Sequence, residues 1–274
     1  MPKIKEILEA VKDQKAKGLF LSGIKNFDRA VEGISPGEVM IVSSPPAFGK
    51  TAFCTAVTLS CVNKKIKVLY LTSSPVSYLA KRLASLNAKA PFYIEYIEGV
   101  EIEETKIPGI EGDVPGELEQ IIERYAVREP AEELKGMDPM EMYTRELPAW
   151  LLIIDSIDYV YKYYPKQGNY EEVRCELLKK YIKGIKRLAK KFNAAVIITA
   201  GALDSDEKAE LSREVATCAS LAEVICLLDI DRDEDDQGNV IVKILKNTKR
   251  GPGMITLCLD EKTGMLKDYG RYVG

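Results

Sequence analysis

The 274-residue chain is 46% hydrophobic and 30% charged, and its 39 basic and 42 acidic residues leave a net charge of −3. This length can bury a sizeable core, as one large α/β domain or two small ones. The chain has no histidine, which excludes histidine-based catalysis and histidine-ligated metals. Its six cysteines form no Cys-x-x-Cys pair, which argues against a zinc site or a disulfide framework. Charged residues near the N-terminus prevent an apolar run of the kind found in signal peptides. No apolar run elsewhere approaches the ~20 residues that span a membrane. We therefore expect a cytoplasmic protein without a membrane partner.

The N-terminal segment has the pattern of a short amphipathic helix. Ile4, Ile7, Leu8 and Val11 fall on one helical face. We treat residues 1–18 as a linker helix and residues 19–274 as the main domain. The apolar stripe needs a cover, which is either its own domain or a neighbouring subunit.

The next feature is a phosphate-binding loop. An apolar run ends in a Ser/Pro turn, then Gly-Lys-Thr, then a helical pattern, which predicts strand, loop and helix in that order. Backbone N–H groups of such a loop wrap phosphates, and the helix N-terminus adds a positive dipole. Lys50 would reach the β- and γ-phosphates, and Thr51 would hold Mg²⁺. The residues expected to bind the nucleotide are Ser44, Pro45, Pro46, Ala47, Phe48, Gly49, Lys50, Thr51 and Ala52.

One position departs from the usual loop pattern, which opens with glycine. Ser44 stands there, and serine lacks the free φ of glycine. The alternative is a strand–loop–helix connection that happens to contain Gly-Lys-Thr.

A family resemblance rests on this region. Residues 22–53 read SGIKNFDRAVEGISPGEVMIVSSPPAFGKTAF, which resembles the start of the C-terminal RecA-like ATPase domain of DnaB-type replicative helicases. The same region resembles RecA-like ATPases of the RadA and KaiC kind less closely. The resemblance implies a RecA-like P-loop NTPase, ATP and Mg²⁺ as cofactors, assembly into a ring, and single-stranded DNA as a partner. The alternation of strands and helices independently predicts an α/β fold with a doubly wound, mostly parallel sheet, closed by a C-terminal antiparallel hairpin.

A second buried strand spans residues 66–72, and a helix over 75–88 follows it. Members of the resembled family end this strand in Ser-Leu-Glu-Met, whose Glu positions the attacking water. Ser74 stands at the Glu position here, and a hydroxyl cannot act as a carboxylate base at neutral pH. We therefore expect slow hydrolysis, unless Asp158 or Glu214 takes over that role.

Residues 92–147 form an acidic segment with 16 Asp and Glu against 5 Lys and Arg. Its net charge is −11, so the rest of the chain carries +8. The segment contains one helical pattern, at Leu118, Ile121, Ile122 and Tyr125. We interpret it as an acidic insertion. One reading is that the basic remainder of the chain binds phosphates and the acidic segment does not. The other is that the segment is a solvated surface insertion.

The strand at 150–155 is apolar and ends in Asp155, which is the Walker B pattern. Such an aspartate holds Mg²⁺ through a water or the Thr51 hydroxyl. Residues 151–160, LLIIDSIDYV, resemble the family's IVIDYLQL. The alternative is a strand-end aspartate that caps a helix.

A long helix from residue 169 and a strand over 192–200 resemble the block that follows in the family. The family's phosphate-sensing Ser-Gln is replaced by Gly201 and Ala202. The loops after the two strands contact single-stranded DNA in the family. In the first loop we expect DNA contacts from Lys162, Lys166, Gln167 and Asn169, beside tyrosines that can stack on bases. The second loop, 204–210, is acidic, which argues against strong electrostatic attraction of DNA to this loop.

The C-terminal strands surround a basic turn. Lys249 and Arg250 are the nearest matches to a Lys and an Arg that act in trans on a neighbour's γ-phosphate in the family. The alternative is a basic hairpin turn. With Lys50 and Asp155 they complete the expected catalytic set.

Two functions remain open at this point. The chain is either an ATP-driven motor on single-stranded DNA or a degenerate relative. Such a relative would bind nucleotide and assemble, hydrolyse poorly, and act as a regulatory or scaffold protein.

Overall fold

The structure is a computed structural model that describes residues 20–85, 92–96, 116–127, 149–157, 170–205, 208–230, 239–260 and 262–269. The strands are β1 (Val39–Ser44), β2 (Val68–Thr72), β3 (Phe92–Tyr96), β4 (Trp150–Asp155), β5 (Ala194–Asp204), β6 (Ala209–Leu211), β7 (Val224–Ile230), β8 (Asn239–Asn247), β9 (Gly253–Leu259) and β10 (Leu266–Asp268). The helices are α2 (Lys25–Val31), α3 (Lys50–Asn63), α4 (Val76–Ser85), α5 (Gly116–Val127), α7 (Tyr170–Lys191) and α8 (Arg213–Thr217). None of these helices is long and apolar enough to cross a bilayer.

The strands form one sheet in the order β10-β9-β8-β7-β1-β5-β4-β2-β3, with β6 paired to β5. From β3 to β7 every pairing along this order is parallel, and β7, β8, β9 and β10 pair antiparallel. The predicted mostly parallel sheet with antiparallel C-terminal strands is confirmed. Strand β1, which leads into the phosphate loop, lies between β5 and β7 in the middle of the sheet. Its six residues are all buried, as expected for a strand with helices on both faces.

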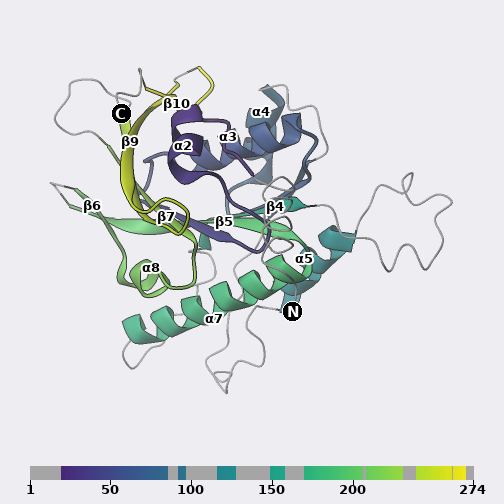
Figure 1. Ribbon diagram of the computed structural model, residues 1–274. Coiled ribbons are helices and arrows are strands. Elements are labelled where there is room, and N and C mark those ends of the chain that lie inside the picture. Colours follow the sequence, from purple (N-terminus) through teal and green to yellow (C-terminus); the bar gives the residue numbers. More distant parts are fainter. Residues whose placement is uncertain are drawn as a thin grey trace, which may run out of the picture.

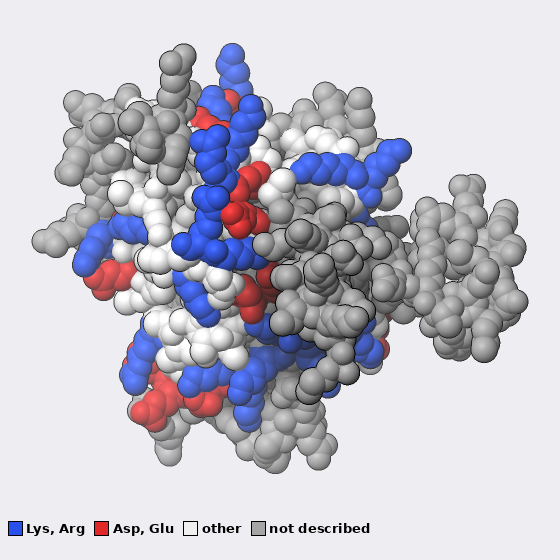
Figure 2. Space-filling view, in the orientation of Figure 1, with Lys and Arg blue, Asp and Glu red and all other residues white. Residues whose placement is uncertain are grey.

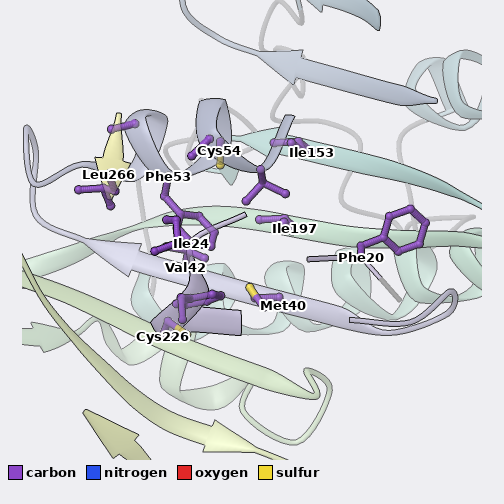
Figure 3. Close-up of a cluster of buried hydrophobic side chains, with 14 of the residues drawn as sticks. Phe20, Ile24, Met40, Val42, Phe53, Cys54, Ile153, Ile197, Cys226 and Leu266 are labelled. Atoms are coloured by element: carbon purple, nitrogen blue, oxygen red, sulfur yellow. The ribbon is translucent and has the colours of Figure 1, made fainter. Parts of the chain in front are cut away.

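Helices cover both faces of the sheet (Figure 1). The side chains of α2, α3 and α4 pack on one face, and those of α5, α7 and α8 pack on the other. Figure 3 shows part of the first cluster, where Phe53 and Cys54 of α3 meet Val42 and Ile197 of the sheet. The ring centroids of Phe27 and Phe53 are 4.9 Å apart, edge to face. Because α3 is packed tightly here, its N-terminus is fixed relative to the end of β1.

Two parts of the acidic segment belong to the body of the domain. Strand β3 pairs with β2 at the edge of the sheet. Helix α5 forms as its periodicity predicts and buries Leu118, Ile121, Ile122 and Tyr125 in the second cluster.

The N-terminus of α2 is capped from the far end of the chain. The Asp268 carboxylate accepts hydrogen bonds from the backbone N–H groups of Lys25 (3.1 Å) and Asn26 (2.9 Å). These N–H groups have no partner within the helix. The contact anchors β10 next to α2, and Leu266 of β10 lies against Gly49 at the start of α3. The C-terminal strand therefore supports the phosphate loop.

Candidate functional site

The phosphate loop connects the carboxyl end of β1 to α3. Ser44 is still part of the strand and pairs in register with Gly201 of β5. Positive φ angles occur at Ala47 (68°) and Gly49 (93°), and Ser44 is not among the described residues that adopt one. The glycine that usually opens this loop is therefore not needed for its conformation here. Gly49 is the N-cap of α3, so the first N–H groups of the helix face the loop without helical partners.

Lys50 folds its ammonium group back into the loop. Its Nζ donates to the backbone oxygens of Ser44 (2.6 Å) and Pro45 (3.1 Å), and to the Ser44 Oγ (3.1 Å). The positive charge thus lies inside the curve of the loop, where phosphate oxygens could replace the carbonyl oxygens as its acceptors.

Asp155 lies directly behind the loop, at the carboxyl end of β4. Its Oδ2 accepts from the hydroxyls of Thr51 (3.0 Å) and Tyr70 (2.7 Å), and its Oδ1 accepts from the Thr199 hydroxyl (2.7 Å). Burial raises the pKa of Tyr70 well above its ordinary value, and the nearby Cys54 and Asp155 raise it further. Tyr70 is therefore a hydroxyl donor at any physiological pH. The structure brings Thr51 and Asp155 together, as the sequence predicted.

A cavity of about 780 Å³ opens beside the loop. Its lining residues are Ala47, Gly49, Lys50, Thr51, Ala52, Tyr78, Lys81, Arg82, Leu259, Lys262, Thr263 and Gly264. Among these described residues, four side chains are cationic and none is acidic, which suits a polyanion. The size falls within the usual range for small-molecule sites.

Thr51 and Asp155 together offer the hard oxygen donors that Mg²⁺ prefers. The described residues contain no group of three or more His, Cys, Asp or Glu side chains that could hold a metal. Two protein oxygens fit Mg²⁺ nevertheless, because this ion keeps several waters and binds substrate phosphates as well. The residues present therefore fit a nucleotide with Mg²⁺.

Sequence comparison gives the family. The profile described as "DnaB-like helicase C terminal domain" matches residues 20–212, which include the loop, Thr51 and Asp155. The chain belongs to this family. No curated protein matches the chain closely enough to count as a relative.

Solved structures share the fold of this DnaB-like domain. A solved ATPase domain matches with a TM-score of 0.68 at 15% identity, covering 98% of this chain and 100% of that one. A DnaB-like replicative helicase, studied with its interactions with primase, matches with a TM-score of 0.62 at 16% identity, covering 98% and 68%. The RadB recombinase matches with a TM-score of 0.59 at 18% identity, covering 92% and 100%.

The DnaB-like site has no carboxylate at the position where a water-positioning group is expected. Ser74 is exposed at the end of β2, and its N–H donates to the Thr72 Oγ1 (3.0 Å). Glu214 lies on α8 and pairs with Arg174 of α7 (3.2 Å), so it is engaged on the opposite face of the sheet from α3. Asp158 lies outside the described residues. Gly201, at the Ser-Gln position, accepts a hydrogen bond from the Ser43 Oγ (3.0 Å) through its carbonyl oxygen.

Lys249 and Arg250 lie in the turn between β8 and β9, at the opposite end of β1 from the loop. The Lys249 Nζ donates to the Glu38 Oε2 (2.7 Å) and the Gly33 carbonyl oxygen (2.9 Å). Arg250 Nε pairs with the Glu32 Oε1 (2.6 Å). Since Glu38 immediately precedes the six residues of β1, these cations are about 20 Å from the loop of their own chain. They contact Glu38 and Glu32 and do not contact the site.

The expected DNA contacts at Lys162, Lys166, Gln167 and Asn169 lie outside the described residues. On the described part of the face in Figure 2, Lys and Arg side chains are interspersed with Asp and Glu side chains. The predicted second loop is shorter than 204–210, because Asp204 ends β5 and residues 209 and 210 belong to β6, which pairs antiparallel with β5.

Several site residues were not predicted. Tyr70 and Thr199 contact Asp155, while Tyr78, Lys81, Arg82 and Lys262 line the cavity. A weak signal existed for the first two, because each is a hydroxyl between two apolar residues of its strand. The strand order that brings them to Asp155 is not visible in the sequence. The others come from α4 and the β9–β10 turn, which only the folded sheet places beside the loop.

Proposed function

We propose that this chain is an ATP-binding domain of a DnaB-like helicase that takes ATP with Mg²⁺ in the cavity beside its phosphate loop. The observation that carries this proposal is the Thr51–Asp155 hydrogen bond (3.0 Å) at a cavity whose described lining residues include four cations and no acid. The N–H groups at the start of α3 and the Lys50 ammonium would bind the β- and γ-phosphates. Thr51 and Asp155 would hold Mg²⁺. The bound ion would neutralise charge on the phosphates.

The two ends of the cavity suggest how the nucleotide lies. The phosphates belong at the loop, so the nucleoside belongs between α4 and the β9–β10 turn. Tyr78 offers an aromatic face there and is 61% exposed. Arg82 lies over Gly264, where an added Cβ would come within 2.5 Å of its guanidinium nitrogen. The end of the Arg82 side chain could move aside, but Gly264 has a φ of 63°, so a side chain at position 264 would strain the turn that borders the cavity.

Two activities are compatible with this nucleotide site, and we favour an ATP-driven motor that hydrolyses ATP slowly. Family membership, Lys50 and the Asp155 geometry support the motor. The second candidate is a nucleotide-binding assembly protein without useful turnover. The uncharged residue at Ser74 supports this candidate, since no described residue lining the cavity carries a carboxylate. We expect the protein to act in the cytoplasm.

The position of the basic turn supports assembly into a ring. Lys249 and Arg250 are too far from their own loop to contact its phosphates, so they would serve a neighbouring copy. Residues 1–18 would dock on that neighbour. Deletion of residues 1–17 should leave a monomer that still binds nucleotide, and light scattering with a non-hydrolysable ATP analogue measures this. If the full chain stays monomeric at tens of micromolar protein, the proposed ring assembly is refuted.

Single-stranded DNA is the proposed track, contacted by Lys162, Lys166, Gln167 and Asn169. A steady-state ATPase assay with and without single-stranded DNA separates the candidates. The motor predicts slow turnover that DNA accelerates, and that the double variant Lys162→Ala/Lys166→Ala loses this acceleration. Turnover at background level in both conditions would favour the assembly protein.

A further inference from the structure

Asp155 is surrounded by more hydroxyl donors than its pairing with Thr51 requires. It lies in β4, which runs between β2 and β5. Tyr70 approaches from β2 and Thr199 from β5, while Thr51 comes from α3. Tyr70 and Thr199 are both fully buried (0% exposed), and Asp155 is 6% exposed. A buried hydroxyl lowers stability unless it is hydrogen-bonded, so these two side chains are explained by the carboxylate that they share.

The register of the strands explains why they meet. Ile153 pairs with Tyr70 on one side and with Ile197 on the other. Since alternate residues of a strand share a face, Asp155 lies on the same face as both Tyr70 and Thr199. The long phenol reaches forward from two positions earlier on β2. Both neighbouring strands thus aim a donor at the same carboxylate.

The hydrogen bonds leave Asp155 little freedom. A carboxylate has about four lone-pair sites, and three of them are occupied by Thr51, Tyr70 and Thr199. Because donors hold both oxygens, the group cannot turn about its Cβ–Cγ bond without breaking a bond to a buried hydroxyl. The remaining site, on Oδ1, can accept one more hydrogen bond.

We propose that Tyr70 and Thr199 are positioning residues that hold Asp155 in the orientation that binds Mg²⁺ together with Thr51. This inference rests on the proposed nucleotide site and extends it to residues that do not touch the nucleotide. Groups that orient metal ligands through hydrogen bonds commonly change metal affinity by ~10–100-fold when they are removed.

The test is the Mg²⁺ dependence of ATP binding, measured as the rise in melting temperature at fixed ATP. Thr199→Val removes the hydroxyl while keeping a β-branched shape suited to the strand. Thr199→Ser keeps the hydroxyl. We expect Thr199→Val and Tyr70→Phe to need at least ~10-fold more Mg²⁺ for half of the rise, and Thr199→Ser to remain close to wild type. The rise with ATP in excess EDTA should be the same in all four proteins.

Matched controls identify a purely structural effect. Thr58→Val removes a buried hydroxyl that bonds the Cys54 carbonyl oxygen (2.8 Å) and not Asp155. Tyr181→Phe changes a buried tyrosine on the opposite face of the sheet. Both should keep the wild-type Mg²⁺ requirement even if their basal melting temperature falls.

The wild-type and variant measurements decide different questions. If wild-type protein shows no ATP-dependent rise with Mg²⁺, the proposed function fails and this inference falls with it. If wild type responds but Thr199→Val and Tyr70→Phe need no more Mg²⁺ than wild type, the proposed function stands and the positioning role is refuted. Equal increases in the Mg²⁺ requirement of the two control variants would refute it as well.

Discussion

Replacing Lys249 or Arg250 by alanine compares a half-buried ion pair with an exposed one. Lys249 makes two contacts, to Glu38 Oε2 and the Gly33 carbonyl oxygen, and the side chains of the Lys249–Glu38 pair are only 21% and 22% exposed. Hydrogen bonds to charged groups contribute ~1.5–3 kcal/mol when they are partly shielded. Loss of Lys249 also leaves the Glu38 charge without its cation, so we expect Lys249→Ala to lower the free energy of unfolding by ~2 kcal/mol.

Arg250 has a different environment. Its pair with Glu32 has side chains that are 52% and 42% exposed, and exposed ion pairs contribute ~0–1 kcal/mol. At ~2–4 °C per kcal/mol for a domain of this size, Lys249→Ala should lower the melting temperature by ~4–8 °C. Arg250→Ala should change it by no more than ~4 °C.

Calorimetry measures the melting temperatures of the two variants. An ATPase assay on the same preparations tests whether either side chain acts on the phosphates bound by a neighbouring copy. We expect Arg250→Ala to lower turnover of the assembled protein while leaving its fold intact. Equal melting temperatures for the two variants would refute the reasoning from burial. Unchanged turnover in Arg250→Ala would refute its role on a neighbour's phosphates.

Three further outcomes follow from individual contacts. Ser74→Glu should raise the rate of phosphate release, because it places a carboxylate where the family has one; an unchanged rate would mean that another group positions the water. Asp268→Ala should cost ~1 kcal/mol, seen as a lower midpoint in urea, because α2 loses the acceptor for two N–H groups; an unchanged midpoint contradicts this. Burial opposes the charged form of Asp229, but the Lys243 ammonium and the Ala209 N–H hold its pKa below the ordinary value. The pair therefore stabilises the fold above about pH 4 and less as the pH falls further. The difference in melting temperature between wild type and Lys243→Met should shrink below that pH, and a constant difference would contradict the assignment.

Much of this fold follows from local sequence patterns. The apolar strands and the Gly-Lys-Thr loop are local signals, since strand burial and the loop conformation depend on residues close together in the chain. The pairing of Thr51 with Asp155 was predicted from the Walker B pattern, which is an aspartate at the end of an apolar strand. The amphipathic pattern of α5 was also sufficient, since its period alone identifies the buried face.

Other features depend on contacts between distant parts of the chain. Nothing near Lys249 in the sequence indicates that Glu38 accepts its ammonium, because the pair forms only when β8 and β9 lie beside β7 and β1. The cavity wall from Lys262 to Gly264 depends on β10 returning to α2 through Asp268. Ser44 was expected to make the loop turn with difficulty, but it remains in the strand, and the turn is made by Ala47 and Gly49.

The central claim is that Lys50, Thr51 and Asp155 bind ATP with Mg²⁺, and calorimetric titration of the nucleotide into the full chain tests it most directly. Lys50→Ala removes the ammonium that lies in the loop, while Lys64→Ala removes an exposed lysine at the other end of the same helix. We predict saturable binding of Mg²⁺-ATP to wild type and Lys64→Ala, and no measurable binding to Lys50→Ala. Binding of equal affinity in all three proteins, or in none of them, would contradict the claim.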